Sequence, residues 1–170
     1  REQYTKAKND IATLELEVKD YANLQLKQQQ IQSEMTKLKD SIKEQEAQIK
    51  IISSSISGEQ KLIDITKAQI VQIQDIGKGS NCPTCTRPLL EEYDKVIANL
   101  SNTIENIQKE KIDKQNLELL KVESSKLVLD KQKDELQNQL QELNKQLAIA
   151  EAKQKDLIKA NGYFKEVETK

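Results

Sequence analysis

Apolar residues recur at alternating steps of three and four through much of the first half of the chain. From Gln28 to Ile73 this stepping reaches fourteen positions, and ten of them are apolar. A heptad repeat sustained over this length is typical of a coiled-coil helix. The fourteen positions, here called the first seam, are Gln28, Ile31, Met35, Leu38, Ile42, Gln45, Ile49, Ile52, Ile56, Glu59, Ile63, Thr66, Ile70 and Ile73.

The residues before Gln28 continue this pattern with one irregularity. Ile11, Leu14, Val18 and Tyr21 form a seam, but Leu24 then follows after a second step of three. An extra step of three is a stammer, which overwinds a coiled coil locally. We therefore expect a local overwinding here and no break in the helix.

A second seam begins just after the centre of the chain. It loses its phase through residues 110–114, and it returns at Leu136. Two separate stretches of heptads predict a second long helix with an irregular middle. The second seam consists of Leu90, Tyr93, Ile97, Leu100, Ile104 and Ile107, and then of Leu136, Leu140, Leu143, Leu147, Ala150, Gln154, Leu157 and Phe164.

The only strong helix breakers between the two seams lie close together. Both prolines fall in the stretch Cys82–Leu89, and Gly77 and Gly79 come just before it. Proline ends a helix, and glycine supplies the usual C-terminal cap. We predict an all-α fold, a long antiparallel intramolecular coiled-coil hairpin. Residues 1–76 form its first arm, 77–89 its apex and 90–170 its second arm, with paired residue numbers adding up to about 167.

Opposed irregularities suggest a joint some distance from the apex. The stretch Ser53–Gly58 holds the weakest helix formers of the first arm, and the predicted pairing sets it against the stretch where the second seam loses phase. We hypothesise a flexible joint at this place. The alternative is that a surface run of serines only lowers local stability.

Composition agrees with a rod and excludes several classes of function. Charged residues make up 32% of the chain and aromatic residues 3%, and the net charge is −1. Such a chain has few residues for a globular core and no basic patch or aromatic platform for nucleic acid. No apolar run is long enough to cross a membrane, and no signal pattern opens the sequence. We expect an intracellular segment (cytoplasm, nucleoid or nucleus) of a longer protein.

The candidate chemistry of the chain lies in its two cysteines. Cys82 and Cys85 form a Cys-x-x-Cys turn, and the sequence has no histidine and no other cysteine. Structural zinc takes four ligands, most often thiolates and imidazoles, so this turn supplies half of a site. The simplest completion is the same turn of a second copy, with one Zn²⁺ shared by a homodimer. Arg87 is close enough to offset the negative charge of such a site, or it is only a solvated side chain.

Other interpretations of the cysteine pair are weaker but stay open. A thioredoxin-type redox pair requires a strand and an α/β fold, and neither is indicated. A disulfide at the turn is possible under oxidation. A zinc ribbon normally brings a second Cys-x-x-Cys in the same chain, which this sequence does not have.

The central octapeptide Cys82-Pro83-Thr84-Cys85-Thr86-Arg87-Pro88-Leu89, set between two heptad arms, resembles the zinc hook of the SbcC-type DNA double-strand-break repair ATPases, relatives of the SMC proteins. Cys82, Pro83, Cys85 and Arg87 match the hook pattern, whereas Thr86 stands where glycine is common and Pro88 also departs from it. The resemblance is specific at the turn. Over the arms it is architectural only.

This resemblance implies a mechanical function. The hook would join two ATPase complexes through zinc and so tether DNA ends, while the ATP-binding head and its contacts with a nuclease subunit and DNA lie outside these residues. No phosphate-binding loop motif occurs here, and we expect no enzymatic activity in this segment. The alternatives are a coiled-coil spacer or adaptor whose tip docks another protein, with free or disulfide-bonded cysteines, and arms that dimerise along their length.

Overall fold

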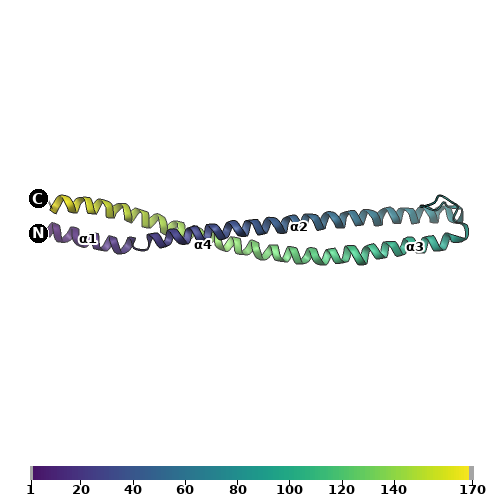
Figure 1. The fold of residues 1–170 in the computed structure, drawn as a ribbon, viewed down its shortest axis with the longest axis horizontal. Helices are drawn as coiled ribbons and strands as arrows, with labels where there is room; N and C mark the ends of the chain where they lie inside the picture. The colour runs from purple at the N-terminus through teal and green to yellow at the C-terminus, as the bar shows by residue number, and fades with distance from the viewer. Residues whose placement is uncertain (1, 169–170) are drawn as a thin grey trace. The chain divides into compact units, whose positions relative to one another are not determined.

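The computed structural model of the protein describes residues 2–168, which are almost entirely helical (Figure 1). No strand occurs among these residues, apart from an isolated antiparallel bridge between Asn81 and Pro88. The all-α prediction is therefore confirmed. The α-helices are α1 (Glu2–Val18), α2 (Tyr21–Ile76), α3 (Tyr93–Asn106) and α4 (Lys114–Glu168). Two short 3-10 helices, η1 (Gly77–Gly79) and η2 (Leu90–Glu92), and a π-helix, η3 (Ile107–Asp113), lie between them.

The chain forms two compact parts. The inner part is Ile42–Val128, and the outer part combines the residues before Ile42 with those after Val128. In the inner part, α2 packs against α3, η3 and the first turns of α4. In the outer part, the two arms meet through Gln28 Nε2, which donates to Asn144 Oδ1 at 2.7 Å, and through the rings of Tyr4 and Phe164, whose centroids are 5.0 Å apart. In each part, therefore, two long helical segments pack against each other.

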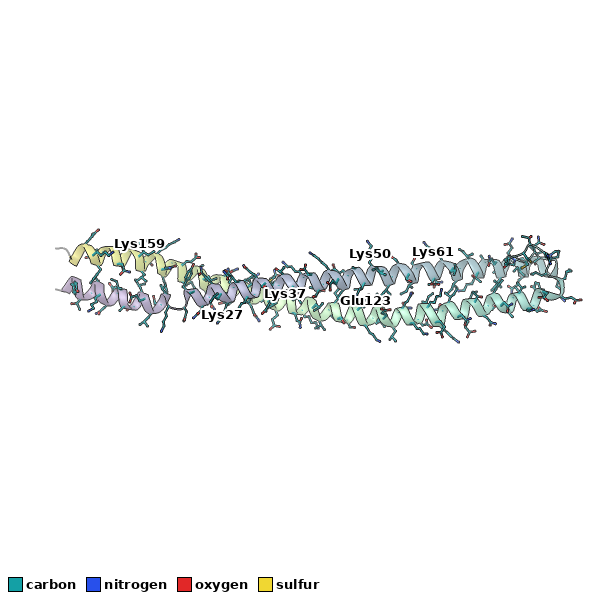
Figure 2. The ribbon with its side chains drawn as sticks, viewed as in Figure 1. Lys27, Lys37, Lys50, Lys61, Glu123 and Lys159 are labelled. Carbon is teal, nitrogen blue, oxygen red and sulfur yellow. The ribbon has the colours of Figure 1, made fainter. Side chains whose placement is uncertain are left out.

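The heptad pattern of the first arm correctly predicts which side of α2 is covered. All fourteen positions of the first seam are buried or half-buried, including the polar members Glu59 and Thr66. Thr66 satisfies its hydroxyl by donating to the carbonyl of Leu62 at 2.8 Å. Charged residues between the seam positions point outward, as Lys50 and Lys61 do in Figure 2.

The best-packed point of the inner part is Ile63. Its exposed fraction is 1%, and it forms a buried cluster with Ile107 and Ile112, against which Ile56 and Ile104 also pack. Burying one isoleucine side chain stabilises a fold by about 1.5–3 kcal/mol. Ile104, which the predicted pairing sets opposite Ile63, packs against the cluster that contains Ile63. The cluster nevertheless reaches roughly one helical turn further along the second arm than the predicted pairing implies.

The phase loss predicted at residues 110–114 corresponds to the π-helix η3. Ile107 and Ile112 are both buried, although five residues separate them. The predicted second-seam positions from Leu136 to Phe164 are all buried or half-buried, but the seam returns earlier than predicted. Seam positions are covered again from Ile112 onward, and polar residues at two of them make the heptad difficult to recognise in the sequence. The recovered positions in the inner part are Ile112, Gln115, Leu119, Val122 and Lys126.

The stammer predicted near Tyr21 takes another form. A two-residue turn, Lys19–Asp20, separates α1 from α2, so the expectation of an unbroken helix is wrong. The helix restarts at once, with the Leu24 N–H donating to the Asp20 carbonyl at 3.0 Å. Val18, Tyr21 and Leu24 remain half-buried. A repeated step of three would require an overwound helix. In the structure a two-residue turn takes the place of that overwinding.

Candidate functional site

The segment that contains the cysteines begins where α2 ends. Gly77 follows Ile76 with a φ of +79°, a left-handed conformation that glycine adopts without steric cost. A Cβ atom at Gly77 would meet nothing within 4 Å, so the backbone angle, and not a lack of space, favours glycine there. The chain thus leaves the α2 axis at a glycine C-cap.

Ser80 fastens the start of this segment to the end of α2. It is buried, with an exposed fraction of 2%. Its hydroxyl donates to the Ile73 carbonyl at 2.8 Å and also contacts the Gly77 carbonyl, which accepts the Ser80 N–H at 2.9 Å. Its own carbonyl accepts the N–H of Leu89 at 2.8 Å. Ser80 therefore links the last turn of the first arm to Leu89, the last residue of the apex.

The cysteine turn itself is closed by main-chain hydrogen bonds. The Cys82 N–H donates to the Arg87 carbonyl at 2.8 Å, and the Thr86 N–H donates to the Cys82 carbonyl at 2.9 Å. Thr86 has a φ of +60°, which is uncommon for a β-branched residue. This is the position where the hook pattern often carries glycine. The residues that pair across the turn are Cys82 and Arg87, and not the two cysteines. The centre of the hairpin therefore lies slightly further along the chain than the predicted pairing places it.

The two thiols differ in their surroundings. Cys82 is half-buried, Cys85 is exposed, and neither forms a disulfide. The pKa of Cys82 is lowered, first by the backbone N–H of Cys85 and then by that of Thr84, both of which donate toward its sulfur. Hydrogen bonds to the charged form stabilise a thiolate. The turn therefore favours Cys82 in the form that binds a metal ion.

A groove runs beside Cys82 on the α2 side of the turn. Its volume is about 330 Å³, and Cys82 and Pro83 form part of its wall. Cys82 thus borders an open space on this side of the turn. The groove is lined by Gln69, Gln72, Ile73, Ile76, Ser80, Asn81, Cys82, Pro83 and Thr86.

The donor set fits half of a tetrahedral zinc site. Two free thiols lie on one short turn, and backbone N–H groups lower the pKa of the first of them, Cys82. Within residues 2–168 no group of three or more histidine, cysteine, aspartate or glutamate side chains could hold a metal ion. Because a closed structural zinc site has four ligands, the remaining two would have to come from another molecule. Arg87 and Lys78 are both exposed near the turn.

One residue of the segment was assigned wrongly from the sequence, and another was missed. Leu90, predicted to begin the second seam, is 60% exposed, whereas Leu89 is 4% exposed. The backbone of Leu90 is left-handed, with a φ of +46°, which turns its side chain away from the seam. Ser80 was not identified as important. Its only sequence signal is a small polar residue directly after the Gly77–Gly79 cap.

Comparison with known proteins yields no relative. No protein-family model, no curated protein and no solved structure matches the chain. Among residues 2–168, no helix combines the length and the apolar character needed to cross a membrane.

Proposed function

We propose that this chain is a zinc-dependent dimerisation segment, a hook and coiled-coil spacer of an SbcC-type, SMC-like DNA repair ATPase. Two copies would share one Zn²⁺ through Cys82 and Cys85 of each chain. The arms would set the distance between the two complexes and so help tether DNA ends in double-strand-break repair. Contacts with DNA and with a nuclease subunit would be made by an ATP-binding head outside these residues.

One observation carries this proposal. Main-chain hydrogen bonds between Cys82 and Arg87 and between Thr86 and Cys82 close the turn that holds Cys82 and Cys85. The sequence has no other cysteine and no histidine, and residues 2–168 contain no group of three or more side chains that could hold a metal ion. A half-site of this kind is complete only when a second molecule contributes its own pair. Zinc binding and association would then be the same event, dependent on metal, on pH and on protein concentration.

The proposal is tested by removing the thiols while the turn is kept. Cys82→Ser with Cys85→Ser retains small polar side chains but cannot form the four-thiolate site. We expect this double variant to be monomeric by sedimentation at zinc concentrations where the unchanged protein dimerises. Thr84→Ser, which keeps both thiols and the neighbouring hydroxyl, is the matched control and should still dimerise.

The opposite result would favour another function. If the double serine variant associates as strongly as the unchanged chain, the arms dimerise along their length and the cysteines are incidental. If neither protein associates at any zinc concentration, the chain is better described as a coiled-coil spacer or adaptor whose tip docks another protein.

A further inference from the structure

The π-helix η3 separates the α-helices α3 and α4 of the second arm at a well-packed point. Ile107 and Ile112 are seam residues near the two ends of η3, and both are buried in the cluster that contains Ile63. In an α-helix, residues five apart differ in direction by about 140°, so both could not face the same partner. A wider turn with i to i+5 hydrogen bonds allows it. The π-helix thus accommodates one residue more than a continuous heptad would need.

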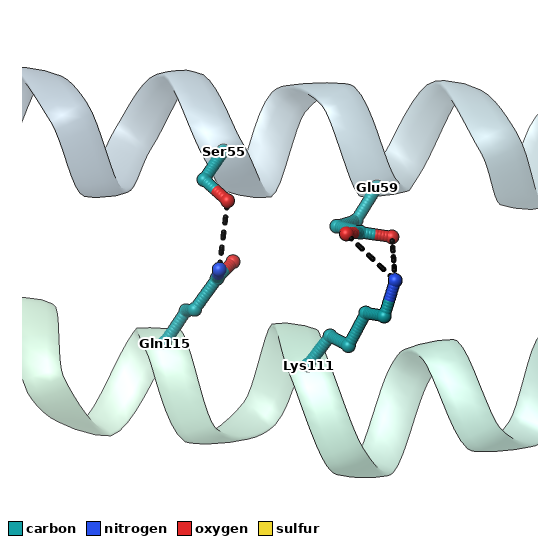
Figure 3. Close-up of polar contacts among 4 residues, drawn as sticks. All are labelled: Ser55, Glu59, Lys111 and Gln115. Atoms are coloured by element: carbon teal, nitrogen blue, oxygen red, sulfur yellow. Dashed lines mark hydrogen bonds and ion pairs between the residues drawn. The ribbon is translucent and has the colours of Figure 1, made fainter.

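Side-chain contacts support this wider turn. Gln108 Nε2 donates to Asp113 Oδ1 at 2.8 Å, and these residues are five apart, the spacing of a π-turn. Lys111 Nζ reaches across to Glu59, at 3.0 Å from Oε1 and 3.2 Å from Oε2 (Figure 3). The first contact depends on the π-helical spacing, and the second holds η3 to α2.

The facing part of α2 has two features that lower local stability. It contains the serine run before Gly58, which has low helix propensity. There Ser55 Oγ accepts a hydrogen bond from Gln115 Nε2 at 2.7 Å (Figure 3). The other amide atom, Gln115 Oε1, is buried without a hydrogen-bond partner among the described residues. A buried acceptor without a partner lowers the stability of the arrangement that contains it.

We propose that η3 is a register switch. It would convert between a π-helical turn, which holds one extra residue of the second arm, and a continuous α-helix. The seam on the side of α3 would then rotate by about 100° relative to the seam of α4. This inference does not depend on zinc or on the proposed hook, because it uses only the packing of the inner part.

The side chains determine which form dominates. If the α-helical phase of α3 continues past Ile107, Lys111 takes the seam position and Ile112 turns away. If the phase of α4 is extended backward from Ile112, Gln108 takes the place of Ile107. Either α-helical form exchanges a buried isoleucine for a polar side chain, so the π-helical form is the major state and the α-helical forms are minor.

Deletion of Lys109, an exposed residue within η3, tests the switch. The deletion leaves Ile107 and Ile112 four residues apart, the normal spacing of a continuous α-helical seam. In the unchanged chain we expect amides at 110–117 to exchange faster than those of the flanking α-helix. In the deletion variant we expect their exchange to slow by about tenfold or more, with no loss of thermal stability.

Deletion of Lys50 is the matched control, since it removes an exposed lysine from the α-helical first arm of the same part. No spare residue can absorb that deletion, so it should put the first seam out of phase and lower the thermal midpoint. The proposal is overturned if deletion of Lys109 lowers the midpoint as much as the control does. It is equally overturned if amides at 110–117 of the unchanged chain exchange no faster than their neighbours.

Discussion

Ser80→Ala should loosen the cysteine turn while leaving the arms intact. The substitution removes the buried hydroxyl that donates to the Ile73 carbonyl at 2.8 Å and contacts the Gly77 carbonyl. A typical intramolecular hydrogen bond contributes about 1 kcal/mol, and a buried carbonyl left without its partner costs about 1–3 kcal/mol. The Gly77 carbonyl keeps the Ser80 N–H as its donor, so the loss falls mainly on the Ile73 carbonyl. Because Ser80 and Ile73 are both buried, with exposed fractions of 2% and 4%, water replaces the lost donor poorly.

We expect the loss of stability in Ser80→Ala to be confined to the cysteine turn. Lowering the free energy of opening by about 1–3 kcal/mol accelerates amide exchange by roughly 5–150-fold, since about 1.4 kcal/mol corresponds to a factor of ten. The sensitive amides are those of Leu89, which donates to the Ser80 carbonyl, and Cys82, which donates to the Arg87 carbonyl. Amides near Ile63 should exchange as before, because the seam there does not depend on the turn.

Hydrogen exchange followed by mass spectrometry or NMR measures this effect. Ser53→Ala is the matched control, since it makes the same chemical change at an exposed position inside α2, where alanine is the better helix former. If the amides of Leu89 and Cys82 exchange at the same rate in Ser80→Ala as in the unchanged chain, Ser80 does not hold the turn and our account of its role is refuted.

Three further predictions concern the core and the turn. Ile63→Ala should destabilise the inner part by about 2–5 kcal/mol in chemical unfolding, because Ile63 is 1% exposed, whereas Ile51→Ala, at a 69% exposed position, should change it by less than about 0.5 kcal/mol; equal effects would contradict the cluster. Since the fold lowers the pKa of Cys82, its alkylation in metal-free folded protein should have a lower pH midpoint than in urea. The stability linked to this shift is present above the unfolded pKa and is lost as pH falls through the folded pKa; coincident midpoints would refute it. Thr86→Gly should stabilise the turn by about 1 kcal/mol by relieving the positive φ, and faster exchange of the Cys82 amide would count against this.

The periodic part of the fold could be predicted from the sequence because burial repeats with the helix. Every first-seam position from Gln28 to Ile73 is covered, since an apolar stripe needs a partner wherever it lies. The loss of heptad phase in the second arm, at residues 110–114, was also visible in the sequence. The pattern could not show how the backbone accommodates the extra residue, since a π-helix, a loop and a flexible joint all shift the phase alike. Whether the Ser53–Gly58 stretch forms a flexible joint stays a prediction.

The details of the cysteine turn were predicted less well, and main-chain geometry explains why. The sequence indicates Cys82 and Cys85 through their spacing, but the closure of the turn on Arg87 depends on backbone hydrogen bonds that carry no side-chain signature. The same is true of Ser80, which acts through carbonyl groups. Leu89 and Leu90 are chemically identical neighbours, so only the left-handed backbone of Leu90 decides which of them is buried.

The central claim is that two chains share one zinc ion through Cys82 and Cys85. It is tested most directly by measuring the mass in solution and the zinc content per chain, before and after treatment with a strong chelator. Our account predicts a dimer with half a zinc ion per chain that becomes monomeric when the metal is removed. A zinc-free protein whose mass does not respond to the chelator would contradict it.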